Sequence, residues 1–217
     1  MKYDLVIFDL DGTLLNTLAD LTDAANHALA AAGMPPRTQE DVRRFIGNGV
    51  ARLMRLSAPE GTPEDVLAAL LADFKARYTA HVNDRTLPYP GVPELLASLR
   101  ATGIHTAINS NKVDSATRQL WRAHFPEHIE LALGERPDIP KKPAPDGAQR
   151  LMAHFGASPA RTLYVGDGDA DILTAANAGI DGAWVSWGYR RPEELADLHI
   201  PRRFDTVEAL QAFLLAP

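Results

Sequence analysis

Cysteine is missing from the 217 residues of the sequence, which excludes disulfide bonds and thiolate chemistry. This absence is compatible with a reducing cytoplasm, where we expect the protein to act. The sequence also lacks any apolar run near the roughly 18 residues of a membrane span. Asp4 and Asp9 interrupt the N-terminus where a signal peptide would be apolar. We therefore expect neither a membrane-spanning segment nor a membrane partner.

Basic tracts interleaved with aromatic residues are missing as well. The formal net charge is -6, which favours solubility and argues against nucleic acid as a partner. The pairs Arg43-Arg44, Arg190-Arg191 and Arg202-Arg203 are isolated, and we expect them on the solvated surface. The remaining composition, 46% hydrophobic and 23% charged, is that of an ordinary globular protein. This length suits one large domain or one domain with a modest insertion.

The N-terminal stretch predicts a buried strand followed by two acids. Residues 5–8, with the sequence LVIF, form a short apolar run typical of a strand that is buried on both faces. Asp9 and Asp11 follow, and on an extended backbone their side chains point to the same side. Open α/β folds bind ligands beyond the carboxyl ends of their strands. Two carboxylates placed there repel each other unless they are protonated or bridged by a cation, so the pattern favours a functional site over a polar turn.

Residues 18 to about 82 show helical periodicity and no strand candidate. Apolar residues at spacings of three and four predict a first helix over 18–32, which Gly33 should end. Thr38 and Thr62 are expected to cap two further helices, each followed by acids that favour a helix start. The segment is therefore predicted to be all-helical.

A segment rich in proline, residues 83–93, follows these helices and marks a domain edge. We expect residues 1–17 and 88–217 to form one α/β core. Residues 18–87 are then expected to form an all-helical cap inserted into that core after its first strand. The ends of the cap would act as hinges.

Beyond the linker the pattern alternates between strand and helix. The expected helices cover 93–102, 114–124, 146–155, 170–178 and 206–215, and the expected strands cover 105–109, 129–133, 162–165 and 182–186. Asp205 is the expected cap of the last helix. Such alternation implies parallel βαβ units with right-handed crossovers. The predicted fold class is an α/β, doubly wound, Rossmann-like parallel sheet.

Three later segments carry polar residues at places where they would share a crevice with the first strand. They are Ser110-Asn111-Lys112 after an apolar strand, Lys141-Lys142 beside Pro143 ahead of a helix, and Gly166-Asp167 with Asp169 and Asp171 after another apolar strand. If these strands are neighbours, carboxylates, a hydroxyl group and an amine meet at one sheet edge.

Together these strings resemble the four motifs of the haloacid dehalogenase-like hydrolases, in the same order and spacing. The motifs are DLDGT from Asp9 to Thr13, a strand ending in Ser110, Lys142 followed by proline, and Gly166-Asp167 with Asp171. Shorter strings are similar to the phosphoglycolate phosphatase branch: IGNG at 46–49, SNK at 110–112, KKP at 141–143 and WGY at 187–189. The resemblance covers nearly the whole chain. It implies a phosphatase of a small phosphorylated metabolite, with 2-phosphoglycolate as the leading substrate.

The resemblance implies a nucleophile and a general acid among the first acids. Asp9 lies nearest the strand end and would form a covalent aspartyl-phosphate, which splits one difficult step into two. Asp11 would protonate the leaving group and then activate water. An acid at the Asp11 position is associated with the phosphatases of the family rather than with its dehalogenases. Lys142 would bind the phosphate and pair with the nucleophile.

The resemblance also implies a Mg²⁺ site built from oxygen ligands. Asp9 and Asp167 would hold the ion, with the backbone carbonyl of Asp11 beside them. Asp171 would either ligate directly or orient the other ligands. Asp169 is not required by the resemblance, and we expect it to be a helix cap or an outer charge.

Substrate contacts follow from the same resemblance. The residues expected to bind substrate or phosphate are Ser110, Asn111, Lys142, Gly12, Thr13, Asn48 and Gly49. Arg52, one helical turn beyond the last of these, is expected to lie on the surface rather than to contact an anion.

Other functions stay open at this point. A sugar phosphomutase similar to β-phosphoglucomutase, a pyrophosphatase and a nucleotide phosphatase would use the same core motifs. A receiver domain, which also binds Mg²⁺ and accepts phosphate on an acid, is disfavoured by the spacing of Asp9 and Asp11 and by the large insertion. The expected partner is a small-molecule phosphate ester, and the protein is expected to be a monomer or a homodimer.

Residue types argue against two other metal sites. A calcium loop that starts at Asp167 would need glycine where Ile172 stands. A zinc pair of His124 and His128 is disfavoured because Pro126 between them disrupts a shared helical face.

Overall fold

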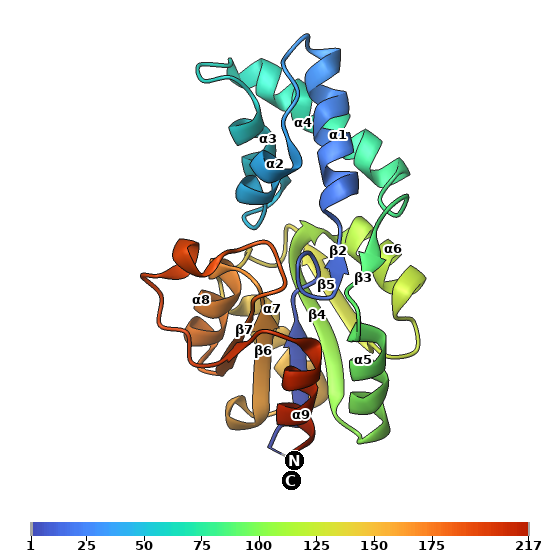
Figure 1. Cartoon of the computed structure of the whole chain (residues 1–217), viewed down its shortest axis with the longest axis vertical. Coiled ribbons are helices and arrows are strands. Elements are labelled where there is room, and N and C mark those ends of the chain that lie inside the picture. The colour runs from blue at the N-terminus through green and yellow to red at the C-terminus, as the bar shows by residue number, and fades with distance from the viewer. Residues whose placement is uncertain (1, 217) are drawn as a thin grey trace.

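The computed structural model describes residues 2–216 as a parallel sheet flanked by helices, with a further group of helices beyond one sheet edge (Figure 1). Within these residues the main sheet has six strands in the order β5-β4-β1-β6-β7-β8. The strands are β1 (Leu5–Phe8), β4 (His105–Val113), β5 (Leu131–Glu135), β6 (Thr162–Gly166), β7 (Asp181–Val185) and β8 (Arg203–Phe204). All five neighbouring pairs are parallel, which confirms the predicted doubly wound α/β fold.

Strand β1 lies at the centre because both of its faces are apolar. Its four residues are fully buried, and they divide between two hydrophobic clusters. Val6 and Phe8 pack in one cluster, and Leu5 and Ile7 in the other, as the alternation of side chains along a strand requires. Hydrogen bonding to β4 on one side and β6 on the other then fixes which chain ends come together.

Helices cover both faces of the sheet. They are α5 (Val92–Ala101), α6 (Asp114–His124), α7 (Asp146–Phe155), α8 (Asp169–Ala178) and α9 (Val207–Leu215). Leucines of α5 and α9 share the cluster that holds Phe8, whereas Leu151 of α7 and Ala175 of α8 share the cluster that holds Ile7. Each crossover therefore buries apolar area on the face that it covers.

The all-helical segment is confirmed, and it lies beyond the carboxyl ends of the strands (Figure 1). It consists of α1 (Leu18–Ala31), α2 (Gln39–Phe45), α3 (Val50–Ser57) and α4 (Glu64–Ala80), which we call the helical insertion. Its interior is apolar, with Leu29 and Phe74 fully buried. Two short antiparallel strands, β2 (Leu15–Asn16) and β3 (Leu87–Pro88), pair where the chain enters and leaves the insertion.

Several element boundaries differ from the sequence predictions. Strand β4 runs on to Val113, so Ser110 lies inside the strand rather than at its end. The pairs β2–β3 and β7–β8 were not predicted, because two-residue strands carry no periodic signal. No helix within residues 2–216 is long and apolar enough to cross a bilayer.

Two predicted helix caps were wrong. The hydroxyl of Thr62 donates to the carbonyl oxygen of Pro59, and Pro63 takes the cap position of α4. At α9 the hydroxyl of Thr206 accepts the backbone N–H of Ala209. The carboxylate of Asp205, the predicted cap, instead accepts from Ser186 and Arg203. In both places another acceptor or donor nearby competes with the helix end.

We predict that Thr206→Ala lowers the free energy of unfolding by about 1 kcal/mol, since it leaves an N–H of the first turn of α9 without its acceptor. Asp205→Ala should lower it less, because it removes only exposed contacts. Urea unfolding of the two variants provides the measurement. Equal losses, or a larger loss for Asp205→Ala, would contradict the assignment of the cap.

Candidate active site

The candidate site residues meet because three neighbouring strands end at one sheet edge. Asp9 follows β1 directly, Asp167 follows β6, and Ser110 lies near the end of β4. They line a cavity of about 50 Å³ between the sheet edge and the helical insertion. The lining from the sheet side includes Asp9, Asp11, Ser110, Lys112, Lys142 and Asp167. A cavity of this size holds only a few water molecules.

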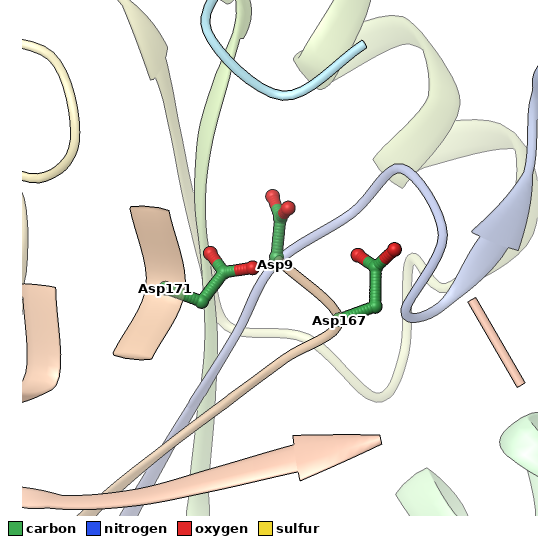
Figure 2. Close-up of side chains that lie close together, drawn as sticks. All are labelled: Asp9, Asp167 and Asp171. Carbon is green, nitrogen blue, oxygen red and sulfur yellow. The ribbon is translucent and has the colours of Figure 1, made fainter. Parts of the chain in front are cut away.

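Three carboxylates form the centre of the site. One oxygen from each of Asp9, Asp167 and Asp171 lies within 4.8 Å of the others. Figure 2 shows the carboxylates of Asp9 and Asp167 directed to the same side, with that of Asp171 turned toward Asp9. Oxygen donors at this spacing fit a hard cation such as Mg²⁺.

Lys142 links two of these acids. Its Nζ lies 2.8 Å from Oδ1 of Asp9 and 2.6 Å from Oδ1 of Asp171. The other oxygen of Asp171 accepts the backbone N–H of Gly168 at 2.9 Å. Asp171 therefore orients Lys142, and each of its oxygens keeps a lone pair that a cation could take.

Burial shifts the pKa values of the ionisable groups in this cluster. Burial, with a further contribution from the Asp171 carboxylate, raises the pKa of Asp9 to about 7. Burial and the carboxylates of Asp171 and Asp9 raise the pKa of Asp167 to about 8. For Lys142 burial acts to lower the pKa, but Asp171 and Asp9 outweigh it and raise the pKa well above its ordinary value. The site thus holds an excess of negative charge that a cation would relieve.

Asp167 is held by the chain around it. The backbone N–H of Tyr189 donates to its Oδ2 at 2.6 Å, and the Thr13 hydroxyl donates to its Oδ1 at 3.3 Å. Gly12 has φ of 84°, and a Cβ there would lie 2.4 Å from Oδ2 of Asp167. A Cβ on Gly188 would likewise lie 2.5 Å from Cγ of Asp167. Gly12 and Thr13, expected from the sequence to contact phosphate, thus lie against Asp167.

Asp11 lies in a different environment from Asp9. Its carboxylate accepts from Lys112 Nζ at 2.8 Å on each oxygen, and Oδ1 also accepts the Thr17 hydroxyl at 2.7 Å. The motif at residues 110–112 contains Lys112 but predicts no role for it. Its signal was the two-residue spacing from Ser110, which on an extended strand places both side chains on the cavity side.

Asn111 and Ser110 differ in whether their side chains keep a hydrogen-bond donor for a ligand. The side-chain amide of Asn111 donates to the carbonyl oxygens of Gly47 and Lys142, both at 3.1 Å, and accepts the Lys142 N–H at 2.8 Å. It therefore joins the lysine loop to the insertion. The Ser110 oxygen accepts the backbone N–H of Lys112 at 3.3 Å, which leaves its own O–H available for a ligand.

The glycine segment between α2 and α3 covers the cavity. Gly47 and Gly49 line it, whereas Asn48, predicted with Gly49 to contact substrate, is not among its lining residues. Arg52 is exposed, in keeping with the expectation that it lies on the surface. Asp169 is the first residue of α8 and lies 3.6 Å from Arg190, as an outer charge rather than the helix cap, which is Gly168.

The prediction that the arginine pairs are solvated surface was wrong for Arg43 and Arg190. Arg43 is buried, donates to the carbonyl oxygen of Tyr189 and pairs with Glu194 at 2.8 Å. Arg190 donates to the carbonyl oxygens of Arg43 and Ile46. Residues 187–194, which we call the docking loop, thus tie helix α2 to the site. Sequence patterns missed these contacts because they depend on where the insertion lies.

Comparison with known proteins identifies relatives along the whole chain. The sequence model of the haloacid dehalogenase-like hydrolases matches residues 6–185. A phosphoglycolate phosphatase of Caulobacter vibrioides is 35% identical over 94% of this chain and 89% of its own length. An N-acetylmuramic acid 6-phosphate phosphatase of Pseudomonas aeruginosa is 31% identical over 89% of this chain and 86% of its own.

Solved structures agree with this. A protein of Lactobacillus delbrueckii subsp. bulgaricus superposes with a TM-score of 0.93 at 33% identity, covering 100% of both chains. A predicted phosphoglycolate phosphatase of Haemophilus somnus superposes with a TM-score of 0.86 at 27% identity, over 98% of this chain and 99% of that one.

We predict that Gly12→Ala lowers the free energy of unfolding by roughly 3 kcal/mol, because it adds backbone strain and a collision with Asp167. Gly33→Ala is the matched control: its φ of 68° is also positive, but its Cβ would meet nothing within 4 Å. That variant should lose only about 1 kcal/mol. Denaturant unfolding measures both, and equal losses would show that the Asp167 contact imposes no constraint at Gly12.

A second prediction concerns pH. Because the pKa of Asp167 is about 8 in the folded protein and about 4 when unfolded, the native state binds more protons between these values. In metal-free buffer the stability of the wild-type protein should therefore fall, relative to Asp167→Asn, as pH rises from 5 to 8. We expect the difference in Tm to change by about 3 °C or more. Thermal unfolding in chelator provides the measurement, and saturating Mg²⁺ should reduce the trend.

A Tm difference between the wild-type protein and Asp167→Asn that stays constant over this pH range would contradict the raised pKa.

Proposed function

Since the chain belongs to the haloacid dehalogenase-like hydrolase family, we propose that it hydrolyses a small phosphorylated metabolite, with 2-phosphoglycolate as the leading substrate. The enzyme is a phosphatase of phosphate monoesters, as its relatives are. The observation that carries the finer proposal is the meeting of Asp9, Lys142 and Asp167 in a small cavity between the sheet and the helical insertion.

Asp9 is the proposed nucleophile. An oxygen of its carboxylate attacks phosphorus, the bond from phosphorus to the ester oxygen breaks, and the alkoxide takes a proton from Asp11. Water then attacks the aspartyl-phosphate and gives a proton to Asp11, while the bond between phosphorus and the Asp9 oxygen breaks. Lys142, within 2.8 Å of Asp9, neutralises charge on the transferring group in both steps. The Ser110 O–H is the proposed donor to a phosphoryl oxygen.

The donor set fits Mg²⁺. The site contains four carboxylates and two lysines, Lys112 and Lys142. When all of them are ionised, two negative charges remain to be balanced; the acids are Asp9, Asp11, Asp167 and Asp171. Asp9 and Asp167 would hold the ion with the backbone carbonyl of Asp11, and Asp171 would act through Lys142. Bound there, the metal supplies charge neutralisation for the phosphoryl group.

The helical insertion is the proposed cap. Its residues Leu21, Ile46, Val50 and Leu53 give the cavity an apolar roof, which would exclude water while the aspartyl-phosphate forms. We propose residues 1–17 and 88–217 as the catalytic core and residues 18–87 as the cap, with the β2–β3 pair at the hinge.

Cavity size favours a small substrate. With the apolar roof close over the carboxylates, the cavity suits a two-carbon leaving group better than a muramic acid, which one relative is named for. The second candidate substrate is a sugar phosphate, which is supported by the 31% sequence identity to that relative. It would bind only when the cap is displaced.

The test is phosphate release from a panel that contains 2-phosphoglycolate, N-acetylmuramic acid 6-phosphate, a hexose 1-phosphate, pyrophosphate and a nucleoside monophosphate. We expect 2-phosphoglycolate to have the highest kcat/KM, activity to be lost in chelator and restored by Mg²⁺, and no isomerised sugar phosphate to form. Asp9→Asn should lower kcat by about 10³-fold or more, since it removes the nucleophile.

Asp169→Asn is the control, because it removes an acid that lines the cavity but pairs only with Arg190 at its outer side. It should retain activity within about fivefold. Normal turnover by Asp9→Asn would contradict the assignment of Asp9 as the nucleophile. Isomerisation of the hexose phosphate would show a phosphomutase rather than a phosphatase.

A further inference from the structure

Lys112 is a buried lysine that the proposed steps do not use. Its side chain is 2% exposed, and its Nζ lies 2.8 Å from both oxygens of Asp11. The ring of Tyr78, on helix α4 of the insertion, covers the amine, with 4.6 Å between Nζ and the ring centroid. A cation in so dry a place interacts strongly with any charge that reaches it.

The amine retains a hydrogen-bonding group for a ligand. A lysine ammonium carries three donors, and the two oxygens of Asp11 take two of them. Within residues 2–216 no oxygen or nitrogen acceptor other than those of Asp11 hydrogen-bonds Nζ, the Tyr78 ring being its further contact, and Lys112 lines the cavity. The remaining donor is therefore available to a molecule that enters the site.

The other cations of the cavity wall are committed elsewhere. Lys142 pairs with Asp9 and Asp171 at the phosphate end of the site. The Arg190 guanidinium donates to two carbonyl oxygens of the insertion and lies 3.6 Å from Asp169. Among the lining residues, Lys112 is the cation placed on the leaving-group side, beside the proposed general acid.

The position of Lys112 specifies where its ligand atom must lie. An ester oxygen that takes its proton from Asp11 lies about 2.7 Å from a carboxylate oxygen that is itself 2.8 Å from Nζ. A group two bonds beyond that ester oxygen is then within reach of the amine. Without a cation at this point, an anionic group there would be repelled by the Asp11 carboxylate.

We propose that Lys112 determines specificity by binding a carboxylate on the leaving group of the substrate. This carboxylate is attached directly to the carbon that bears the phosphate. The substrate class is thus the small 2-phospho-carboxylates. This inference rests on the proposed function and assigns the selectivity of the same site to one residue. The apolar roof and the Tyr78 ring strengthen the ion pair by excluding water.

The test compares 2-phosphoglycolate with its neutral isostere 2-phosphoglycolamide, in which an amide replaces the carboxylate. The wild-type enzyme should prefer the carboxylate by about 30-fold or more in kcat/KM, the effect of one buried charge-assisted hydrogen bond. Lys112→Met, which keeps length and removes charge, should bring the ratio of the two kcat/KM values near one. Lys112→Arg should restore part of the preference.

Lys141→Met is the matched control. Lys141 neighbours the site, but its amine pairs with Glu135 at 2.8 Å and it is not among the residues that line the cavity. Its ratio should equal that of the wild-type enzyme. Circular dichroism and thermal unfolding check that each variant folds, and Lys112→Arg carries the comparison if Lys112→Met does not.

The outcomes separate two kinds of failure. If Lys112 only positions Asp11, Lys112→Met lowers turnover of both substrates by one factor and leaves their ratio unchanged, which overturns the inference. A wild-type ratio near one with both substrates hydrolysed overturns it as well, while the phosphatase proposal stands. Hydrolysis of neither substrate, with acetyl phosphate still hydrolysed, removes 2-phosphoglycolate as the substrate and the inference with it.

Discussion

The excess of buried carboxylate charge is the constraint on which the site depends. One oxygen from each of Asp9, Asp167 and Asp171 lies within 4.8 Å of the others, and within residues 2–216 only Lys142 is within ion-pair distance of two of these acids. Such a cluster persists only where backbone N–H groups, a cation or protons offset the repulsion. The N–H groups of Gly168 and Tyr189 supply part of this. The same imbalance that costs stability favours the binding of a divalent cation.

Much of this arrangement could be predicted from the sequence, because it follows from sheet geometry. An apolar run followed by Asp9 and a second followed by Asp167 must end at one edge if the strands are parallel neighbours, and they are. The helical insertion could be predicted for a similar reason, since periodicity is a local signal. Features that depend on local periodicity or on parallel strand pairing can therefore be predicted from the sequence.

Contacts between the insertion and the core could not be predicted in this way. Arg43 and Arg190 have the composition of a solvated surface, and only the position of helix α2 over the docking loop makes them interior partners. The caps at Thr62 and Asp205 failed for a related reason: the structure offered those side chains nearer partners than the helix ends. Lys112 was visible as a residue type, but its pairing with Asp11 required the two strands to be in register.

The docking loop has a thermodynamic consequence. Its Tyr189 holds Asp167 through the backbone and Thr17 through the phenol oxygen, while Arg190 binds the carbonyl oxygens that end helix α2. One short segment therefore shares its contacts between the carboxylate cluster and the roof above it. If a ligand bound to the carboxylate cluster stabilises the roof in its position over the cavity, the roof in that position must raise the affinity of the cluster for the ligand by the same free energy. In the proposed closing motion, closure of the roof and occupancy of the carboxylate cluster are therefore thermodynamically coupled.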